Sequence, residues 1–279
     1  MKAKLFYRSI AMFLVICCSC PNTRAADVKQ VTTHSRSMNK DIGAIVITPE
    51  GYSAETAYPV LYLLHGYSGN ENDWITKVPE IGHYADQYQF IIVCPDGAYS
   101  SWYFDSPVDK NMKYETYIAD ELVAWVDQSF CTIKSREGRA ITGLSMGGHG
   151  ALYLAIRNQD VFGAAGSMSG GVDIRPFPNN WDLPTRLGAY AENKENWEEN
   201  TVINLVNKLK ADSLKITFDC GMDDFFYGVN CRLHEKFMER NIPHEFTVRP
   251  GGHTWEYWAN SIAFQTVFFH HFFEKLSDK

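Results

Sequence analysis

The stretch RAITGLSMGGHGALYLA, Arg139–Ala155, decides the fold. A β-rich run precedes Ser145 and an alanine- and leucine-rich run follows it, so the pattern predicts a strand, a sharp turn and a helix. In G-x-S-x-G the serine stands at the turn in a strained backbone conformation, and side chains at the two glycine positions, here Gly143 and Gly147, would collide. This context predicts an exposed, nucleophilic serine at the end of a strand.

Strand-like and helix-like segments alternate along most of the chain. Strands are expected at 43–49, 58–66, 90–97, 139–144, 162–170, 214–221 and 244–252, and helices at 83–88, 114–130, 147–158, 232–240 and 255–276. The alternation favours an α/β fold with a mostly parallel central sheet and helices on both faces. Residues 173–200, rich in Pro, Asn and Glu, are expected to form an irregular excursion over the active-site side of a single domain, residues 26–279.

The N-terminus has a different composition. Three basic residues precede an apolar run from Ile10 to Cys18, and small and polar residues follow it. Residues 1–25 are therefore expected to be a secretory signal cleaved after Ala25, which predicts a secreted or periplasmic protein. The alternative is a lipoprotein signal in which Cys20 carries a lipid anchor.

The charge balance excludes two classes of partner. Loss of residues 1–25 leaves 22 basic against 33 acidic residues, a net charge of −11. Such a surface repels nucleic acid and anionic lipid. No stretch after the N-terminus approaches the roughly 20 apolar residues of a membrane span. The sequence gives no indication of oligomeric state.

Four cysteines remain after the signal. Export permits disulfides, and Cys220 and Cys231 are near enough in sequence to form one. The alternative is that all four, with Cys94 and Cys131, are small apolar residues. No His or Cys cluster has metal-ligand spacing, so no metal site is expected.

A serine hydroxyl needs a nearby imidazole to take its proton, and the imidazole needs a carboxylate to fix its tautomer. In the Ser…Asp…His order, both partners follow later strands. His253 comes directly after the strand expected at 244–252. The acid should follow 214–221, where GMDDFF supplies Asp223 and Asp224, and Asp219 lies on the strand itself.

The reaction also needs backbone N–H groups that stabilise an oxyanion. One donor is expected from Met146, directly after the serine. The sequence LLHGYSGNENDW follows an early strand, and its His65-Gly66 pair predicts the second donor at Tyr67. The alternative is that His65-Gly66 only ends the strand in a turn.

Five segments together resemble a known family: LLHGYSGNENDW, PDGAYSSWYFDSP, GLSMGGHGAL, CGMDDFFY and PGGHTWEYW. They are similar to the esterase D-like branch of the α/β-hydrolases, which includes tributyrin esterases, feruloyl esterases and S-formylglutathione hydrolases, and the similarity runs from about Gly43 to Phe273. The resemblance implies an α/β-hydrolase fold without metal or organic cofactor. It implies a nucleophile, base and acid at Ser145, His253 and Asp224, the acid being three residues after the glycine of G-x-x-D, and oxyanion donors at Tyr67 and Met146.

Four aromatic residues are candidates for substrate contact. Trp102, Tyr103 and Tyr227 could wall a pocket for an aromatic acyl group, and Trp181 could contact the alcohol side; the alternative is that they only pack. We expect a secreted serine carboxylesterase acting on small or polysaccharide-linked esters, with feruloyl or acetyl groups of plant polysaccharide as leading substrates. Short-chain tributyrin-type esters are the alternative. An S-formylglutathione hydrolase-like thioesterase fits less well with export. A non-catalytic carbohydrate-binding scaffold is the hypothesis from another class.

Overall fold

The computed structural model describes residues 25–275. The expected signal segment, residues 1–25, lies outside the described residues except for Ala25. Cys20, the alternative lipidation site, lies outside them as well.

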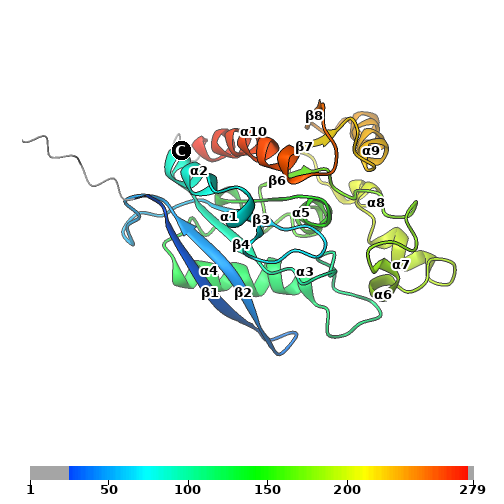
Figure 1. Cartoon of the computed structure of the whole chain (residues 1–279), viewed down its shortest axis with the longest axis horizontal. Coiled ribbons are helices and arrows are strands. Elements are labelled where there is room, and N and C mark those ends of the chain that lie inside the picture. The colour runs from blue at the N-terminus through cyan, green and yellow to red at the C-terminus, as the bar shows by residue number, and fades with distance from the viewer. Residues whose placement is uncertain (1–24, 276–279) are drawn as a thin grey trace, which may run out of the picture.

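The described residues form one sheet in the order β1-β2-β4-β3-β5-β6-β7-β8 (Figure 1). The strands are β1 (Asp27–Ser35), β2 (Lys40–Thr48), β3 (Val60–Leu64), β4 (Ile91–Pro95), β5 (Arg139–Gly143), β6 (Ala164–Met168), β7 (Lys215–Gly221) and β8 (Glu245–Arg249). β2 pairs antiparallel with both β1 and β4, and all pairs from β4 to β8 are parallel. The predicted mostly parallel sheet is confirmed.

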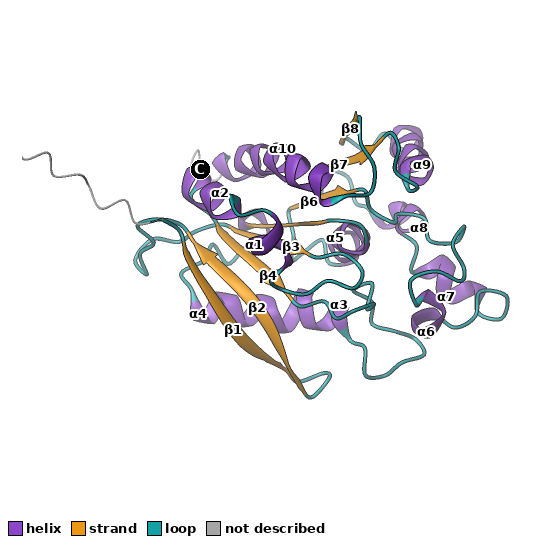
Figure 2. Ribbon diagram, in the orientation of Figure 1, coloured by secondary structure: helices purple, strands orange, loops and turns teal. Residues whose placement is uncertain are grey.

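Helices cover both faces of this sheet (Figure 2). They are α1 (Asp73–Lys77), α2 (Ile81–Tyr88), α3 (Tyr114–Thr116), α4 (Val123–Ser129), α5 (Met146–Arg157), α6 (Leu183–Leu187), α7 (Lys194–Glu199), α8 (Val202–Leu205), α9 (Tyr227–Glu239) and α10 (Trp255–Glu274). A π-helical stretch, η1 (Tyr117–Leu122), joins α3 to α4, and two short 3₁₀ turns are η2 (Arg136–Gly138) and η3 (Val206–Lys208). One buried cluster joins α4, α5, α8 and α9 to the sheet, and a second joins α1, α2 and α10 to the other face.

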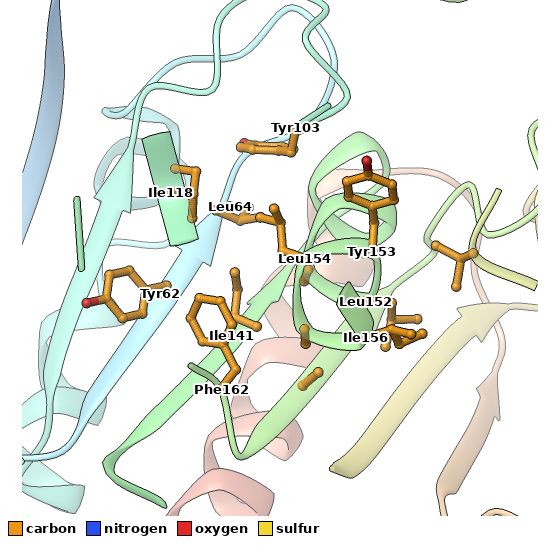
Figure 3. Packing of buried hydrophobic residues seen from close by; sticks show 14 of the residues in the cluster. Tyr62, Leu64, Tyr103, Ile118, Ile141, Leu152, Tyr153, Leu154, Ile156 and Phe162 are labelled. Atoms are coloured by element: carbon orange, nitrogen blue, oxygen red, sulfur yellow. The ribbon is translucent and has the colours of Figure 1, made fainter. Parts of the chain in front are cut away.

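The central helix α5 has no polar face. Every residue from Met146 to Ile156 is buried, because β6, α8 and the segments around the site enclose the helix. Figure 3 shows Leu154 close to the strand residues Leu64 and Ile141. A helix that is apolar all round belongs inside a large core. This enclosure fixes α5, and with it the turn that begins the helix.

The structure adds elements that the sequence pattern did not predict. β1 has a mostly exposed surface, so its side chains show no apolar alternation. The segment 173–200, expected to be irregular, holds the short helices α6 and α7. These helices are five and six residues long, too short to produce a readable helical period.

All four cysteines in the described part of the chain are free. The bridge considered between Cys220 and Cys231 is therefore not formed. Cys94 and Cys220 are buried, and Cys131 and Cys231 are half-buried. Among residues 25–275, no helix is both long and apolar enough to cross a bilayer.

Candidate active site

Ser145 occupies the tight turn between β5 and α5. Its backbone has φ 54° and ψ −115°, in the left-handed half of φ space that non-glycine residues avoid. The N–H of Ser145 donates to the carbonyl of Met168 on β6 at 2.9 Å, and its own carbonyl accepts from His149 at 3.0 Å. Neighbouring segments thus hold the strained conformation that the glycine pattern predicts.

The glycines of the turn are required by close backbone approach. A Cβ on Gly147 would lie 2.5 Å from the carbonyl oxygen of His65 and 2.6 Å from that of Leu64. A Cβ on Gly143 would lie 2.7 Å from the backbone of Gly147. Because these neighbours are main-chain atoms of β3, of the residue after it and of α5, no rotamer change can make room for a side chain.

The loops after β7 and β8 bring an acid and a histidine to the serine. The N–H of Met222 donates to Arg249 O, and the N–H of Asp223 donates to Gly251 O, each at 2.9 Å. These bonds join the two loops side by side. Parallel strands end at the same edge of a sheet, so both loops lie beside the turn after β5.

A continuous hydrogen-bond chain results. His253 Nε2 lies 2.8 Å from Ser145 Oγ, and His253 Nδ1 lies 2.8 Å from Asp224 Oδ2. The other carboxylate oxygen of Asp224 accepts from the N–H of Phe226 at 2.8 Å. The Asp224 side chain is fully buried and acts only as an acceptor, so Nδ1 carries the proton and Nε2 is free to accept from the serine hydroxyl.

The other two candidate acids are placed elsewhere. Asp223 is exposed. Asp219 is buried on β7 and accepts hydrogen bonds from Ser261 Oγ at 2.5 Å and Gln265 Nε2 at 2.8 Å, both on α10. Of the three carboxylates, Asp224 alone is hydrogen-bonded to His253 in the described residues.

Two backbone donors stand beside the serine without partners. Met146 is the first residue of α5, so its N–H has no acceptor within the helix. In the described part of the chain, the N–H of Tyr67 likewise donates to no protein acceptor. A substrate carbonyl oxygen placed between these two groups would accept both hydrogen bonds.

His65 orients the peptide that carries the Tyr67 N–H. The N–H of Gly97 donates to His65 Nε2 at 2.7 Å, which leaves the proton on Nδ1, and Nδ1–H donates to Gly66 O at 2.7 Å. The same carbonyl accepts from Gly69 N at 3.1 Å. Because Gly66 C=O and Tyr67 N–H belong to one peptide plane, fixing the carbonyl on one side turns the N–H to the other.

Aromatic side chains surround His253. Its ring lies 4.2 Å from that of Phe225, 4.8 Å from Trp258 and 5.5 Å from Phe226, between centroids. Phe225 also stacks on Trp181, at 5.6 Å and an interplanar angle of 21°. Phe225 and Phe226 are not among the site residues predicted from the sequence, although these two adjacent aromatic residues directly follow the candidate acid.

The excursion reaches the site at Trp181 and Asp182. Both residues have positive φ, 51° and 57°. The Tyr67 hydroxyl donates to Asp182 Oδ2 at 3.1 Å. The segment that carries Trp181 therefore contacts both Tyr67, in the loop after β3, and Phe225, in the loop after β7.

The other aromatic candidates do not line an open pocket. Trp102 and Tyr103 are buried: Trp102 Nε1 donates to Trp181 O, and the Tyr103 hydroxyl donates to His65 O, both at 3.1 Å. Both side chains are therefore buried and hydrogen-bond to the main chain of residues near the site. Tyr227 begins α9, and among the described residues no aromatic contact joins its ring to His253.

Comparison with known proteins agrees with this geometry. A family model described as "Putative esterase" matches residues 35–268. An acetyl esterase of Caldicellulosiruptor saccharolyticus is 26% identical over 260 residues, which cover 85% of this chain and 95% of that protein.

Solved structures show the same architecture. A ferulic acid esterase is 29% identical with a TM-score of 0.76, and the match covers 89% of this chain and 99% of that one. An S-formylglutathione hydrolase of Staphylococcus aureus, 22% identical, has a TM-score of 0.77 over 88% of this chain and 100% of that one, which shows the fold alone. With an α/β-hydrolase fold and a family match over most of its length, this chain belongs to the putative esterase family and is an esterase.

Proposed function

We propose that this chain is an exported serine carboxylesterase that removes feruloyl or acetyl groups from plant polysaccharide through Ser145, His253 and Asp224. The single observation that carries the catalytic part is the chain of two 2.8 Å hydrogen bonds from Asp224 through His253 to Ser145. Hydroxyl, imidazole and carboxylate in this order are the groups needed to activate a serine.

Acylation begins when Ser145 Oγ attacks the ester carbonyl carbon while His253 Nε2 takes the hydroxyl proton. The negative charge that develops on the carbonyl oxygen is met by the N–H groups of Tyr67 and Met146. His253 then gives its proton to the leaving alcohol oxygen, and the acyl group remains on Ser145. Asp224 stabilises the imidazolium throughout and keeps its charge.

Deacylation repeats the sequence with water. His253 removes a proton from the attacking water, and the same two N–H groups stabilise the second oxyanion. Collapse of that intermediate releases the carboxylic acid and returns the proton to Ser145 Oγ. Every proton in this cycle is moved by groups of the chain itself.

The substrate class rests on the relatives and on the proposed location. An acetyl esterase and a ferulic acid esterase are similar to this chain over most of its length. The first 25 residues support export, because a basic start precedes an apolar run and a small-residue site. An exported esterase needs an extracellular ester, and ester groups on plant polysaccharide meet that requirement.

Replacement of the nucleophile tests the proposal. Ser145→Ala should lower p-nitrophenyl acetate hydrolysis by at least about 10³-fold and abolish labelling by a fluorophosphonate probe. The far-ultraviolet circular dichroism spectrum should stay unchanged. Ser135→Ala, at an exposed position, is the matched control and should keep both properties. Retained labelling of Ser145→Ala would contradict the assignment, and an unlabelled wild-type protein would indicate a non-catalytic scaffold.

A substrate panel tests the class of ester. Purified protein is assayed on methyl ferulate, acetylated xylan and tributyrin. Turnover of methyl ferulate or acetylated xylan that exceeds turnover of tributyrin supports the polysaccharide assignment. A clear preference for tributyrin would replace it with a short-chain lipid-like substrate.

A further inference from the structure

We propose that Phe225 determines the alcohol specificity of this esterase by binding a pyranose ring of the substrate, an inference that rests on the proposed function. The position of the leaving group determines which residues the alcohol moiety meets. Its oxygen takes a proton from His253 Nε2, so it must come within hydrogen-bond reach of that atom. The alcohol moiety therefore occupies the space next to the exposed part of the His253 ring.

Of the three aromatic rings packed around His253, one is open to solvent. Phe226 and Trp258 have exposed fractions of 1% and 7%, whereas Phe225 is 51% exposed. The Phe225 ring is also the nearest of the three to the imidazole, at 4.2 Å. An alcohol moiety that leaves past His253 thus meets Phe225.

Phe225 is held in place by its neighbours. The ring of Phe225 has three aromatic neighbours. Trp181 stacks on it at 5.6 Å, Phe226 contacts it edge-on at 4.7 Å, and the ring of His253 lies 4.2 Å from it, between centroids. Alternate residues of its loop, Asp224 and Phe226, are buried anchors. The exposed ring is a fixed surface, so binding to it costs little side-chain entropy.

The surroundings of this ring fit a sugar. An aromatic face is electron-rich and attracts the polarised C–H groups that line one face of a pyranose. Asp223 is exposed two residues before Phe225, and its main chain lies next to Gly252, directly before His253, so the same loop also carries an exposed carboxylate that can accept hydrogen bonds. A methyl or glycerol group is too small to cover a phenyl ring, and a purely apolar ring gains nothing from the carboxylate.

Three acetyl esters isolate the alcohol side. Methyl acetate, cyclohexyl acetate and mono-O-acetylated methyl β-D-xylopyranoside all give the same acetyl-enzyme, so deacylation is common to them. Differences in kcat/KM therefore report only the alcohol moiety during acylation. The measured quantity is the ratio of kcat/KM for each ring ester to that for methyl acetate, because a disturbance of His253 would cancel in this ratio.

Phe225→Ala should lower the xylopyranoside-to-methyl ratio roughly tenfold, mainly through KM, as expected for loss of one apolar contact surface. Phe225→Tyr keeps an aromatic ring and should stay within about threefold of wild type, while Phe225→Leu should resemble alanine. Phe264→Ala is the matched control, since Phe264 on α10 is 57% exposed, and it should leave the ratio unchanged.

Two results would overturn the inference while leaving the proposed function intact. One is an unchanged xylopyranoside ratio in Phe225→Ala. The other is an equal fall for cyclohexyl acetate, which would make the surface a general apolar site. Absence of wild-type turnover on all three esters, together with no fluorophosphonate labelling, would instead reject the proposed function itself and this inference with it.

Discussion

The turn after β5 and the loop after β7 both bring a side chain to the same site, but they are built in opposite ways. Every residue from Gly138 to Ile156 is buried, and the turn at Ser145 leaves no space for a side chain at Gly143 or Gly147. The loop after β7 instead alternates, with Met222, Asp223 and Phe225 exposed and Asp224 and Phe226 buried. The turn is buried on all sides, whereas the loop is held by its main chain and by two buried side chains, with the other side chains exposed.

We therefore expect the two segments to have different roles: the turn after β5 determines reactivity, and the loop after β7 determines substrate selectivity. The serine, its strained backbone and the two proposed oxyanion donors depend on main-chain packing, which tolerates little change. The exposed side chains of the loop after β7 can change without disturbing the buried ones. Substrate preference is therefore expected to vary at the loop, while the reaction stays constant at the turn.

The strongest test of this comparison lies within the loop after β7, at the adjacent carboxylates Asp223 and Asp224. Asp224→Asn should lower kcat for p-nitrophenyl acetate by about 10³- to 10⁴-fold, because an amide stabilises the wrong imidazole tautomer and no longer balances the imidazolium charge. Asp223→Asn makes the same charge change on an exposed side chain and should keep kcat within about threefold. A collapse of activity in Asp223→Asn, with Asp224→Asn active, would reverse the roles.

The turn is tested by adding one methyl group. Gly147→Ala should destabilise the protein by about 3 kcal/mol, because the new Cβ would overlap main-chain oxygens of the central sheet. The measurement is urea unfolding followed by circular dichroism. Gly228→Ala, in the first turn of α9, meets only Arg232 Nη1 at 3.6 Å and should change stability by less than about 1 kcal/mol. Equal effects of the two changes would remove the claimed difference in tolerance.

Much of the site could be predicted because its signals are local. The turn at Ser145 needs glycine two residues to either side, and His253 and Asp224 directly follow strands that read as apolar runs. In the described residues these three side chains are hydrogen-bonded in one chain. The alternation of strand-like and helix-like segments predicts the parallel pairing, but it does not predict the order of the strands.

Other features depend on contacts that no local pattern contains. The sequence offers Trp102 and Tyr103 either for substrate contact or for packing alone; both side chains are buried, at backbone positions with positive φ, 54° and 60°. Two consecutive non-glycine residues in the left-handed region have no sequence signature. The stacking of Trp181 on Phe225 joins segments more than 40 residues apart and exists only after the sheet is assembled.

The smallest expected effect is on the pH dependence of stability, at a buried histidine of α5. His149 on α5 is fully buried, and burial lowers its pKa from 6.5 to about 4. The unfolded chain binds a proton at this residue below about pH 6.5 and the folded chain does not, so the stability that neutral His149 contributes is present above pH 6.5 and is lost as the pH falls towards 4.

His149→Phe should remove that pH dependence. Between pH 7.5 and 4.5 the free energy of unfolding should fall by about 2 kcal/mol less in the variant than in wild type, as measured by urea unfolding at each pH. The substituted ring would pack among Trp102, Phe104 and Tyr153. His83→Phe, on the exposed side of α2, should leave the wild-type dependence unchanged. If His83→Phe reduced the pH dependence of the free energy of unfolding by the same amount, the effect would be due to general surface charge and not to the burial of His149.

The strained conformation of Ser145 has a consequence for refolding kinetics. Ser145 N–H is held by Met168, and the turn rests on β3, whose pairing with β5 joins residues about 80 positions apart. Such distant pairing forms slowly, and a chain that has collapsed without it has no means of holding the serine in the reactive geometry. Ester turnover regained after dilution from denaturant is therefore expected to count molecules that have completed their sheet, and to lag behind optical signals of compaction.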